Sequence, residues 1–300
     1  MRADYINLVN THIVPIKPSY HSPENLEELL KLIDRYRERA RILAGGTDLI
    51  VDMKLRRKTP EHIISLKKIK DLEYVLEDGI AMRIGAAVKL KMIEKSRIVQ
   101  ERFQALHEAV KSIGSVQIRN MGTLVGNICN ASPAADTAPP LLVFNASVVA
   151  ESLNGKRTIP INEFFKGPGA TCLEDNEIVR EVSIPYPPIN SGSSFLKIGR
   201  VGVDLAKVNV AVFIKLNGEL VEECRIALGA VAPTPIRITK AEEYLKSRSI
   251  TEENLRVVQE IVAEEVKPIT DVRSTEWYRR EVSKILVRDA IKIAVERVKK

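Results

Sequence analysis

The chain has 300 residues, a length that accommodates one large domain or two ordinary ones. Its 45% hydrophobic and 28% charged residues are typical of a globular protein and exclude disordered, collagen-like and coiled-coil chains. No stretch approaches 18 consecutive apolar residues, and Met1–Tyr5 lacks the apolar core of a signal peptide, so we expect no membrane span and a cytoplasmic location.

The net charge of +7 raises the question of nucleic-acid binding. The strongest basic stretch, Lys54–Lys70, contains seven Lys or Arg and one Glu, and acidic residues follow it directly. No aromatic residue interleaves with it, so we expect neither a platform for stacked bases nor a nucleic-acid partner. Solvent, a phosphate group and a partner protein all stay open as what this stretch faces. The many Lys, Glu, Ile and Val residues, with only four Gln, indicate a thermophile.

The hydrophobic pattern predicts most elements of the first half of the chain. Residues 24–39 carry apolar residues at helical spacing after a Ser-Pro start signal. Arg41–Ala44 predicts a buried strand that ends at a glycine turn. The other expected elements are an apolar pattern at 49–55, strands at 63–66 and 82–87, a helix at 103–112 and an apolar segment at 141–150. Small and polar residues dominate 114–136, where we expect neither helix nor strand.

The second half contains two groups of chain breakers, Gly167–Gly169 and Tyr186–Gly192, and the second group predicts a domain boundary. Beyond it, strand-like runs at 208–216 and 225–231 and the Asn217-Gly218 pair predict a meander with a hairpin. Two amphipathic helices are expected at the end, at 252–266 and 276–298. The pattern indicates an α+β protein with at least two domains.

The cysteines and histidines do not predict a metal site or a disulfide framework. Their spacing lacks a ligand pattern, so we interpret the cysteines as small core residues and expect no close pair among the histidines. These residues are Cys129, Cys172, Cys224, His12, His21, His62 and His107.

The turn Gly45–Asp48 is the first candidate for a binding site. A phosphate needs backbone N–H groups at close approach, and glycine allows that approach because it has no Cβ. The hydroxyl of Thr47 can add a donor. A Gly-Gly turn is also commonplace between two elements, so an ordinary structural role stays open.

The segment Gln117–Asp136 is the second candidate. Few cores contain so many small and hydrogen-bonding residues over twenty positions, which favours a loop around a polar ligand. Gly122 and Gly126 give backbone access, and a carboxylate such as Asp136 suits sugar hydroxyls rather than phosphate. A long connection without a ligand is the alternative. Neither a Rossmann fingerprint nor a Walker loop occurs, and no catalytic set is legible, so a cofactor is expected to carry any difficult chemical step.

Together the two segments resemble the FAD-binding medium subunit of the molybdenum hydroxylases. This family includes the flavoprotein subunits of carbon monoxide dehydrogenase, xanthine dehydrogenase and archaeal glyceraldehyde-type oxidoreductases. The resemblance extends along the chain. It rests on Leu43–Leu49 with Met53–Arg56, Ile84–Val88, Gln117–Asp136 with Pro139–Leu142, Gly167-Pro168, Ile184-Pro185, Lys197–Arg200, Asp204–Ala206, Ile226–Val231 and Tyr278-Arg279.

The resemblance implies an α+β fold, with a two-lobed vanillyl-alcohol-oxidase-type (PCMH-type) FAD-binding domain at 1–182 and a smaller α+β domain at 190–300. The lobes would be about 1–60 and 61–182, with non-covalent FAD extended between them, because the first loop has no His or Cys for attachment. It also implies the site residues. Backbone donors to the pyrophosphate would come from Leu43, Ala44, Gly45, Gly46, Thr47, Asp48, Leu49, Ile50, Thr123, Leu124, Val125, Gly126 and Asn127. Asp136 would contact the sugar-like part, and Ile113, Val179 and Lys197 would add flavin contacts. Where the family usually has Gly-Gly-Asn, Val125 replaces the first glycine, so a looser approach is expected there.

The implied function is electron relay, with no catalytic residue and no metal on this chain. Substrate would be oxidised at molybdopterin on a large subunit, and two [2Fe-2S] clusters on a small subunit would pass the electrons to FAD. An external acceptor would then take them. The family expectation is a heterohexamer with two copies of each chain, and the composition favours an aldehyde as substrate. The alternatives are a stand-alone FAD oxidoreductase of the same fold and a nucleotide-binding subunit without a redox role.

Overall fold

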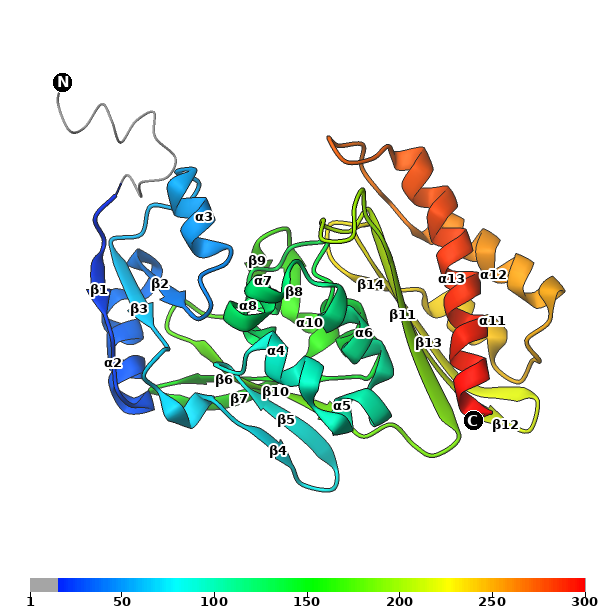
Figure 1. Ribbon diagram of the computed structural model, residues 1–300, viewed down its shortest axis with the longest axis horizontal. Helices are drawn as coiled ribbons and strands as arrows, with labels where there is room; N and C mark the ends of the chain where they lie inside the picture. Colours follow the sequence, from blue (N-terminus) through cyan, green and yellow to red (C-terminus); the bar gives the residue numbers. More distant parts are fainter. Residues whose placement is uncertain (1–15, 300) are drawn as a thin grey trace.

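The computed structural model describes residues 16–299, in three parts that lie side by side (Figure 1). We name them the N-terminal lobe (16–66), the middle lobe (67–187) and the C-terminal region (188–299). The predictions made for Met1–Tyr5 and His12 lie outside the described residues. Within 16–299, no helix is long and apolar enough to cross a membrane.

The N-terminal lobe is a three-stranded parallel sheet in the order β1-β3-β2, flanked by two helices. Its elements are β1 Ser19–His21, α2 Leu26–Tyr36, a 3₁₀ turn Arg37–Arg39, β2 Ala40–Leu43, α3 Leu49–Lys54 and β3 His62–Ser65. The side chain of Asn25 caps α2 by accepting from the N–H of Glu28, and the apolar face of the helix is buried. This confirms the helix predicted within 24–39. The strand expected at 41–44 is present, but its burial was predicted wrongly because only Ala40 is buried.

The middle lobe has a five-stranded antiparallel sheet in the order β4-β5-β10-β6-β7 and a two-stranded ribbon, β8-β9. The strands are β4 Val75–Glu77, β5 Ala81–Gly85, β6 Ser147–Ser152, β7 Gly155–Pro160, β8 Phe165–Gly167, β9 Ala170–Thr171 and β10 Ile178–Pro185. The helices are a 3₁₀ turn Lys70–Leu72, α4 Leu90–Lys95, α5 Arg97–Arg102, α6 Gln104–Ser112, α7 Val116–Met121, α8 Leu124–Cys129, α9 Ala138–Val143 and α10 Ile161–Phe164. The strands expected at 63–66 and 82–87 and the helix at 103–112 are confirmed.

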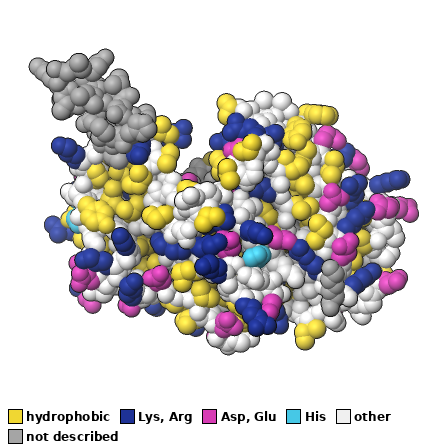
Figure 2. Space-filling view, in the orientation of Figure 1, with side chains coloured by type: hydrophobic (Ala, Val, Ile, Leu, Met, Phe, Trp, Pro, Cys, Tyr) yellow, Lys and Arg dark blue, Asp and Glu magenta, His cyan; other side chains and the backbone are white. Residues whose placement is uncertain are grey.

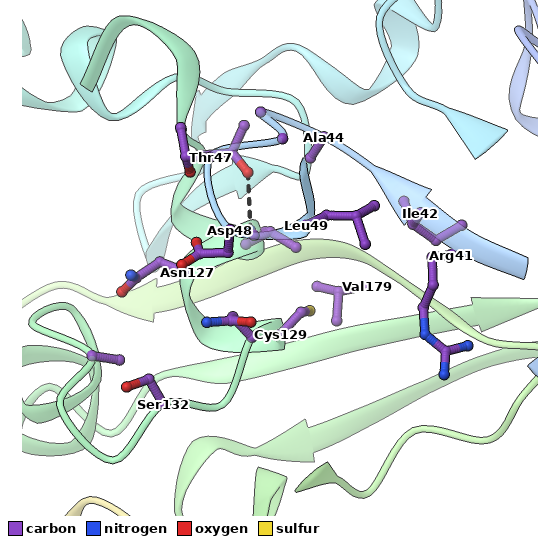
Figure 3. A pocket seen from close by; sticks show the side chains of 18 of the residues that line it. Arg41, Ile42, Ala44, Thr47, Asp48, Leu49, Asn127, Cys129, Ser132 and Val179 are labelled. Carbon is purple, nitrogen blue, oxygen red and sulfur yellow. Dashed lines mark hydrogen bonds between the residues drawn. The ribbon is translucent and has the colours of Figure 1, made fainter. Parts of the chain in front are cut away.

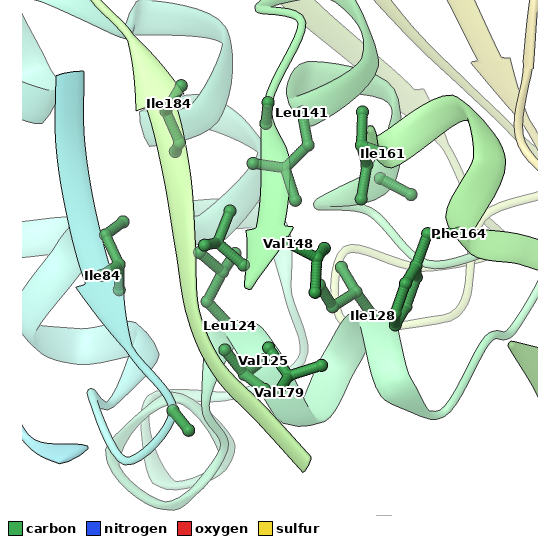
Figure 4. Close-up of a cluster of buried hydrophobic side chains, with 14 of the residues drawn as sticks. Ile84, Leu124, Val125, Ile128, Leu141, Val148, Ile161, Phe164, Val179 and Ile184 are labelled. Carbon is green, nitrogen blue, oxygen red and sulfur yellow. The ribbon is translucent and has the colours of Figure 1, made fainter. Parts of the chain in front are cut away.

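Two short helices, α7 and α8, occupy the segment in which we expected neither helix nor strand, so that prediction was wrong. Capping is one reason. The hydroxyls of Ser115 and Thr123 accept hydrogen bonds from the first turns of α7 and α8. The other reason is packing: Leu124 and Ile128 of α8 are fully buried against the five-stranded sheet (Figure 4). Packing and capping thus offset the low intrinsic helix propensity of Gly126 and its neighbours.

The C-terminal region contains a four-stranded antiparallel sheet in the order β11-β12-β13-β14 and three helices. Its elements are β11 Ser191–Ile198, β12 Val208–Asn217, β13 Leu220–Gly229, β14 Ile236–Arg237, α11 Thr239–Leu245, α12 Glu252–Glu265 and α13 Glu276–Val298. The predicted hairpin is confirmed, and its turn requires glycine because Gly218 has φ +62°. The two predicted terminal helices are confirmed as α12 and α13.

The sheet of the C-terminal region is buried on both faces. Phe195, Ala211 and Phe213 belong to the same hydrophobic cluster as the core of the middle lobe. Val210 and Val212, which alternate with them along β12, belong to a second cluster with α11, α12 and α13. Because both faces are covered, β12 is a nearly continuous hydrophobic run rather than an alternating one.

Candidate cofactor-binding site

A cavity of about 800 Å³ lies between the two lobes and reaches the C-terminal region. Figure 2 shows the molecule hollowed along its upper edge, between the side that bears the N-terminal lobe and the side that bears the C-terminal region. Most of the predicted site residues line this cavity: Ala44, Gly45, Gly46, Thr47, Asp48, Leu49, Ile113, Thr123, Val125, Gly126, Asn127, Asp136, Val179 and Lys197. Leu43, Ile50 and Leu124 do not line it, and Leu124 belongs to the core.

The first glycine turn lies directly against the end of α7. A Cβ added to Gly45 would lie 2.7 Å from both the Cα of Gly122 and the carbonyl carbon of Met121, and closer still to the Met121 carbonyl oxygen. The absence of a side chain at Gly45 therefore allows two backbone segments to touch. Gly46 has φ +73°, a conformation that glycine adopts without strain. Both glycines thus shape the wall of the cavity through the backbone.

Thr47 and Asp48 complete this wall. Figure 3 shows their side chains near Asn127, which belongs to the second predicted segment. Burial raises the pKa of Asp48 above its usual value, and the nearby carboxylate of Asp52 acts in the same direction, whereas Lys58 opposes them. The surroundings of Asp48 therefore favour its protonated form more than water does. The Thr47 hydroxyl and the Asn127 amide in this part of the cavity are neutral hydrogen-bonding groups.

The second wall is the polar side of α8. Its N–H at Gly126 donates to the Thr123 hydroxyl, 2.9 Å away, and the hydroxyl of Thr137 donates to Oδ1 of Asn127 at 2.6 Å. A Cβ at Gly126 would come within 2.8 Å of the Thr123 hydroxyl oxygen. Glycine at 126 therefore preserves the cap of α8 as well as the open wall. Val125 also lines the cavity, although most of its side chain is in the core (Figure 4).

The end of the cavity near the C-terminal region contains a buried ion pair. Lys197 Nζ donates to Asp136 Oδ2 at 2.6 Å and to the carbonyl oxygen of Ser112 at 3.2 Å. Asn209 Nδ2 donates to Asp136 Oδ1 at 2.7 Å. Burial raises the pKa of Asp136, against the opposing effects of Lys197 and Asn209. Strands β11 and β12 of the C-terminal region therefore meet the middle lobe at one carboxylate.

Several residues that line the cavity had not been predicted from the sequence. Among them is Arg41, which Figure 3 shows with Ile42 on the side opposite Ser132. Arg57 and Lys58, from the basic stretch, also line the cavity, and Lys58 Nζ lies 3.3 Å from a carboxylate oxygen of Asp52. The sequence had left a phosphate group open as one of three things that this basic stretch could face. The other end of the basic stretch points elsewhere, since Lys68 pairs with Glu24 and Lys70 with Glu73.

The expectation for the histidines needs correction, whereas the cysteines pack against the hydrophobic cores as interpreted. Parallel pairing of β1 with β3 brings His21 and His62 together, with Nε2 and Nδ1 3.0 Å apart, so the expected absence of a close histidine pair was wrong. No group of three or more metal-ligating side chains occurs within 16–299. Cys224 is buried in the core of the C-terminal region, and Cys129 and Cys172 are partly buried and pack against the larger core. Cys129 also lines the cavity.

The cavity fits an extended dinucleotide. Its volume is within the range of small-molecule sites, which is about 300–1,000 Å³. One stretch is bordered by the two glycine-containing segments, where backbone groups are accessible, as a pyrophosphate requires. Apolar side chains such as Ile42, Ile113 and Val179 supply surfaces for flat rings. Hydroxyl and amide groups such as Thr47 and Asn127 supply partners for a sugar-like chain.

Comparison with known proteins agrees with this geometry. Residues 14–187 match the family described as the FAD binding domain in molybdopterin dehydrogenase, and residues 193–294 match the carbon monoxide dehydrogenase flavoprotein C-terminal domain. The chain is 33% identical to the glyceraldehyde dehydrogenase medium chain of Sulfolobus acidocaldarius, over 93% of this chain and 98% of that protein. It is also 33% identical to the carbon monoxide dehydrogenase medium chain of Hydrogenophaga pseudoflava, over 94% of this chain and 98% of that protein.

A solved structure of carbon monoxide dehydrogenase from Hydrogenophaga pseudoflava superimposes with a TM-score of 0.92 at 33% identity, covering 95% of this chain and 99% of that one. These findings confirm the predicted fold class, the FAD-binding domain and the family. The chain therefore belongs to the FAD-binding medium subunits of the carbon monoxide dehydrogenase, xanthine dehydrogenase and aldehyde dehydrogenase family of molybdopterin-dependent oxidoreductases.

Proposed function

We propose that this chain holds FAD non-covalently in the cavity between its lobes and relays electrons within a molybdenum hydroxylase complex. The observation that carries the proposal is the convergence of both glycine-containing segments on one cavity of about 800 Å³, within the residues that match an FAD-binding domain. We assign the cofactor to Leu43–Ile50, Ile113, Thr123–Asn127, Asp136, Val179 and Lys197. We further propose an FAD-binding domain at 1–182, with lobes at about 1–60 and 61–182, and a second domain at 190–300.

Non-covalent binding is supported by the side chains along the cavity. Within 16–299, Cys129 is the one cysteine that lines it, and no histidine does. Burial raises the pKa of the Cys129 thiol to about 12, so the nucleophilic thiolate is scarce at neutral pH. A covalent bond to the cofactor would need such a nucleophile.

In this proposal the cofactor supplies the redox chemistry and the chain supplies binding, orientation and a shielded environment. Backbone groups of the two glycine segments hold the pyrophosphate, and Asp136 with Lys197 fixes the end of the cavity near the C-terminal region. The polar side of α8 holds the middle of the cofactor through Thr123 and Asn127. The similarity of the chain to the medium chains of multi-subunit dehydrogenases supports a relay rather than an independent substrate reaction.

The partners in this proposal are a large subunit with molybdopterin and a small subunit with two [2Fe-2S] clusters, with two copies of each chain in a heterohexamer. Electrons from substrate oxidation on the large subunit pass through the clusters to this chain and leave to an external acceptor. The similarity to a glyceraldehyde dehydrogenase medium chain supports an aldehyde as the substrate of the complex. A cytoplasmic location and a thermophilic source stay part of the proposal.

The test is an absorption spectrum of the purified chain, followed by chromatography of what heat denaturation releases. We expect the two-banded spectrum of oxidised flavin, with FAD rather than FMN in the supernatant and no flavin left on the protein. Dithionite should bleach the bands and air or another acceptor should restore them. A colourless protein that takes up no added FAD would refute the proposed function. Flavin that stays on the denatured chain would refute non-covalent binding alone.

A further inference from the structure

Asn209 is an unusual residue for its position. It is fully buried near the start of β12, between Val208 and Val210, in a strand that is otherwise almost entirely apolar. Asparagine is depleted in strands, and a buried amide is costly unless its hydrogen bonds are made. Among the residues that the structure describes, its Oδ1 has no hydrogen-bond partner. A valine here would continue the apolar pattern but would leave Oδ1 of the buried Asp136 without the hydrogen bond from Asn209 Nδ2.

The strand opposite makes room for this side chain. Asn209 pairs with Gly229 on β13, and a Cβ at Gly229 would collide with the Asn209 amide oxygen. The next residue, Ala230, donates its N–H to the carbonyl oxygen of Pro133 at 2.7 Å. Asn209 on β12 and Ala230, which directly follows β13, therefore both hold the loop that contains Asp136. The missing side chain at Gly229 thus provides the space that the Asn209 side chain occupies.

Through Asp136, Asn209 acts on the cavity wall. Its Nδ2 donates to Asp136 Oδ1 at 2.7 Å, while Lys197 donates to Oδ2 at 2.6 Å. The same ammonium donates to the carbonyl oxygen of Ser112, which precedes the cavity residue Ile113. Each carboxylate oxygen therefore has its own donor, and the two donors together fix the rotation of the carboxylate about its Cβ–Cγ bond. Asn209 itself does not line the cavity.

We propose that Asn209 is a positioning residue of the cofactor site, which orients the Asp136 carboxylate, and through it the Lys197 ammonium, from the C-terminal region. The inference rests on the proposed function, because it takes FAD as the occupant of the cavity. It assigns the C-terminal sheet a direct part in shaping the site: the Asp136 loop has its working geometry only when β12 and β13 are docked on it.

The test compares FAD affinity and stability in the full-length protein. Asn209→Leu keeps the branched shape and the number of side-chain heavy atoms and removes the donor. We expect FAD to bind about tenfold more weakly, the change that corresponds to losing one hydrogen bond to a charged group. Ser194→Ala is the matched control. It removes another buried hydrogen bond of the same sheet, from the Ser194 hydroxyl to the carbonyl oxygen of Ala290, away from the cavity. This control should lose comparable stability and keep its FAD affinity.

A second variant, Asn209→Asp, tests the positioning role through the pH dependence of FAD affinity, which a purely structural role of Asn209 would leave unchanged. The introduced carboxyl faces Asp136, so the two acids share a proton at low pH, and the protonated one donates the missing hydrogen bond. Lys197, on β11, is the charged group that contacts Asp136 among residues 16–299. We expect FAD affinity near the wild-type value at pH 5 and progressive loss towards pH 8, while the wild type changes less over that range (pH values are rough brackets around a shared-proton titration).

The outcomes separate the inference from the proposed function. A wild-type protein that binds no FAD overturns both. A wild type that binds FAD, with unchanged affinity in Asn209→Leu and a flat pH profile in Asn209→Asp, overturns only the role of Asn209. Weaker binding in Asn209→Leu that is matched by Ser194→Ala also overturns it, because the effect would then follow stability.

Discussion

Replacing Gly45 with alanine tests whether the two glycine segments must touch for the cavity to form. The added Cβ would lie 2.7 Å from two backbone carbons of Met121 and Gly122, below the 3.0 Å that such contacts essentially never cross. No side-chain rotation relieves this clash, since its partners are backbone atoms. The turn and the end of α7 must therefore move apart, which widens the cavity where it is bordered by both segments.

The expected cost is about 1–3 kcal/mol of unfolding free energy, the usual range for overpacking in a tight contact. In a chain of this size that corresponds to a few degrees in the melting temperature, measured by calorimetry. FAD affinity should fall by more than about tenfold, because displacement of backbone donors weakens several contacts at once. Fluorescence titration of the flavin-free protein measures this affinity.

Gly167→Ala is the control for Gly45→Ala. Nothing lies within 4 Å of a Cβ at Gly167, and its φ is not positive, so alanine is accommodated without strain. This control should melt like the wild type and bind FAD normally. If Gly45→Ala behaves like Gly167→Ala in both measurements, the contact between the segments does not shape the site and the reasoning fails.

Two further predictions concern buried and paired charges. Asp136→Ala should weaken FAD binding and also lower the unfolding free energy by about 3–5 kcal/mol, because Lys197 is left as a buried, unpaired charge. Adding Lys197→Met should restore part of the stability but not the FAD affinity. An Asp136→Ala protein as stable as the wild type would contradict the role of the ion pair. Burial and the nearby charges of His62 and Arg35 lower the pKa of His21 below 6.5, so the unfolded state binds more protons and stability should fall as the pH drops below about 6.5. Urea unfolding between pH 7.5 and pH 5.5 checks this (rough brackets around the unperturbed histidine value), and an equal loss in His21→Gln would show that another group is responsible.

The elements that followed a strong hydrophobic period could be predicted from the sequence, and those held by tertiary contacts could not. Helix α2 and the hairpin of β12 and β13 carry their own signals, an apolar stripe and an Asn-Gly turn. Strand β11 begins Ser191-Gly192-Ser193-Ser194, which reads as a loop. It is a strand because it pairs with β12 along its whole length, and α13 packs on it so closely that a Cβ at Gly192 would collide with the backbone of Ala294.

The site shows the same division. The two glycine segments were recognisable because close backbone approach requires glycine wherever the segments lie in space. Arg41 and Asn209 could not be recognised from the sequence. Arg41 belongs to the site because β2 borders the cavity. Asn209 is placed by the register of β12 with β13. Asp136 was predicted as a sugar contact, but its partners, Lys197 and Asn209, come from a part of the chain 61 and 73 residues away.

The sheet that is buried on both faces has a consequence for how this family can be taken apart. The linker before β11 looks like a place to cut, but Phe195 and Phe213 complete the core on the other side of it. After a cut at that point, the C-terminal fragment would expose these aromatic side chains, and the N-terminal fragment would expose the apolar surface that they cover. Both fragments would tend to aggregate. Exchange of the C-terminal piece between relatives therefore has to preserve the residues on its inner face along with those of its own core. The chain therefore has to be expressed and engineered as a whole.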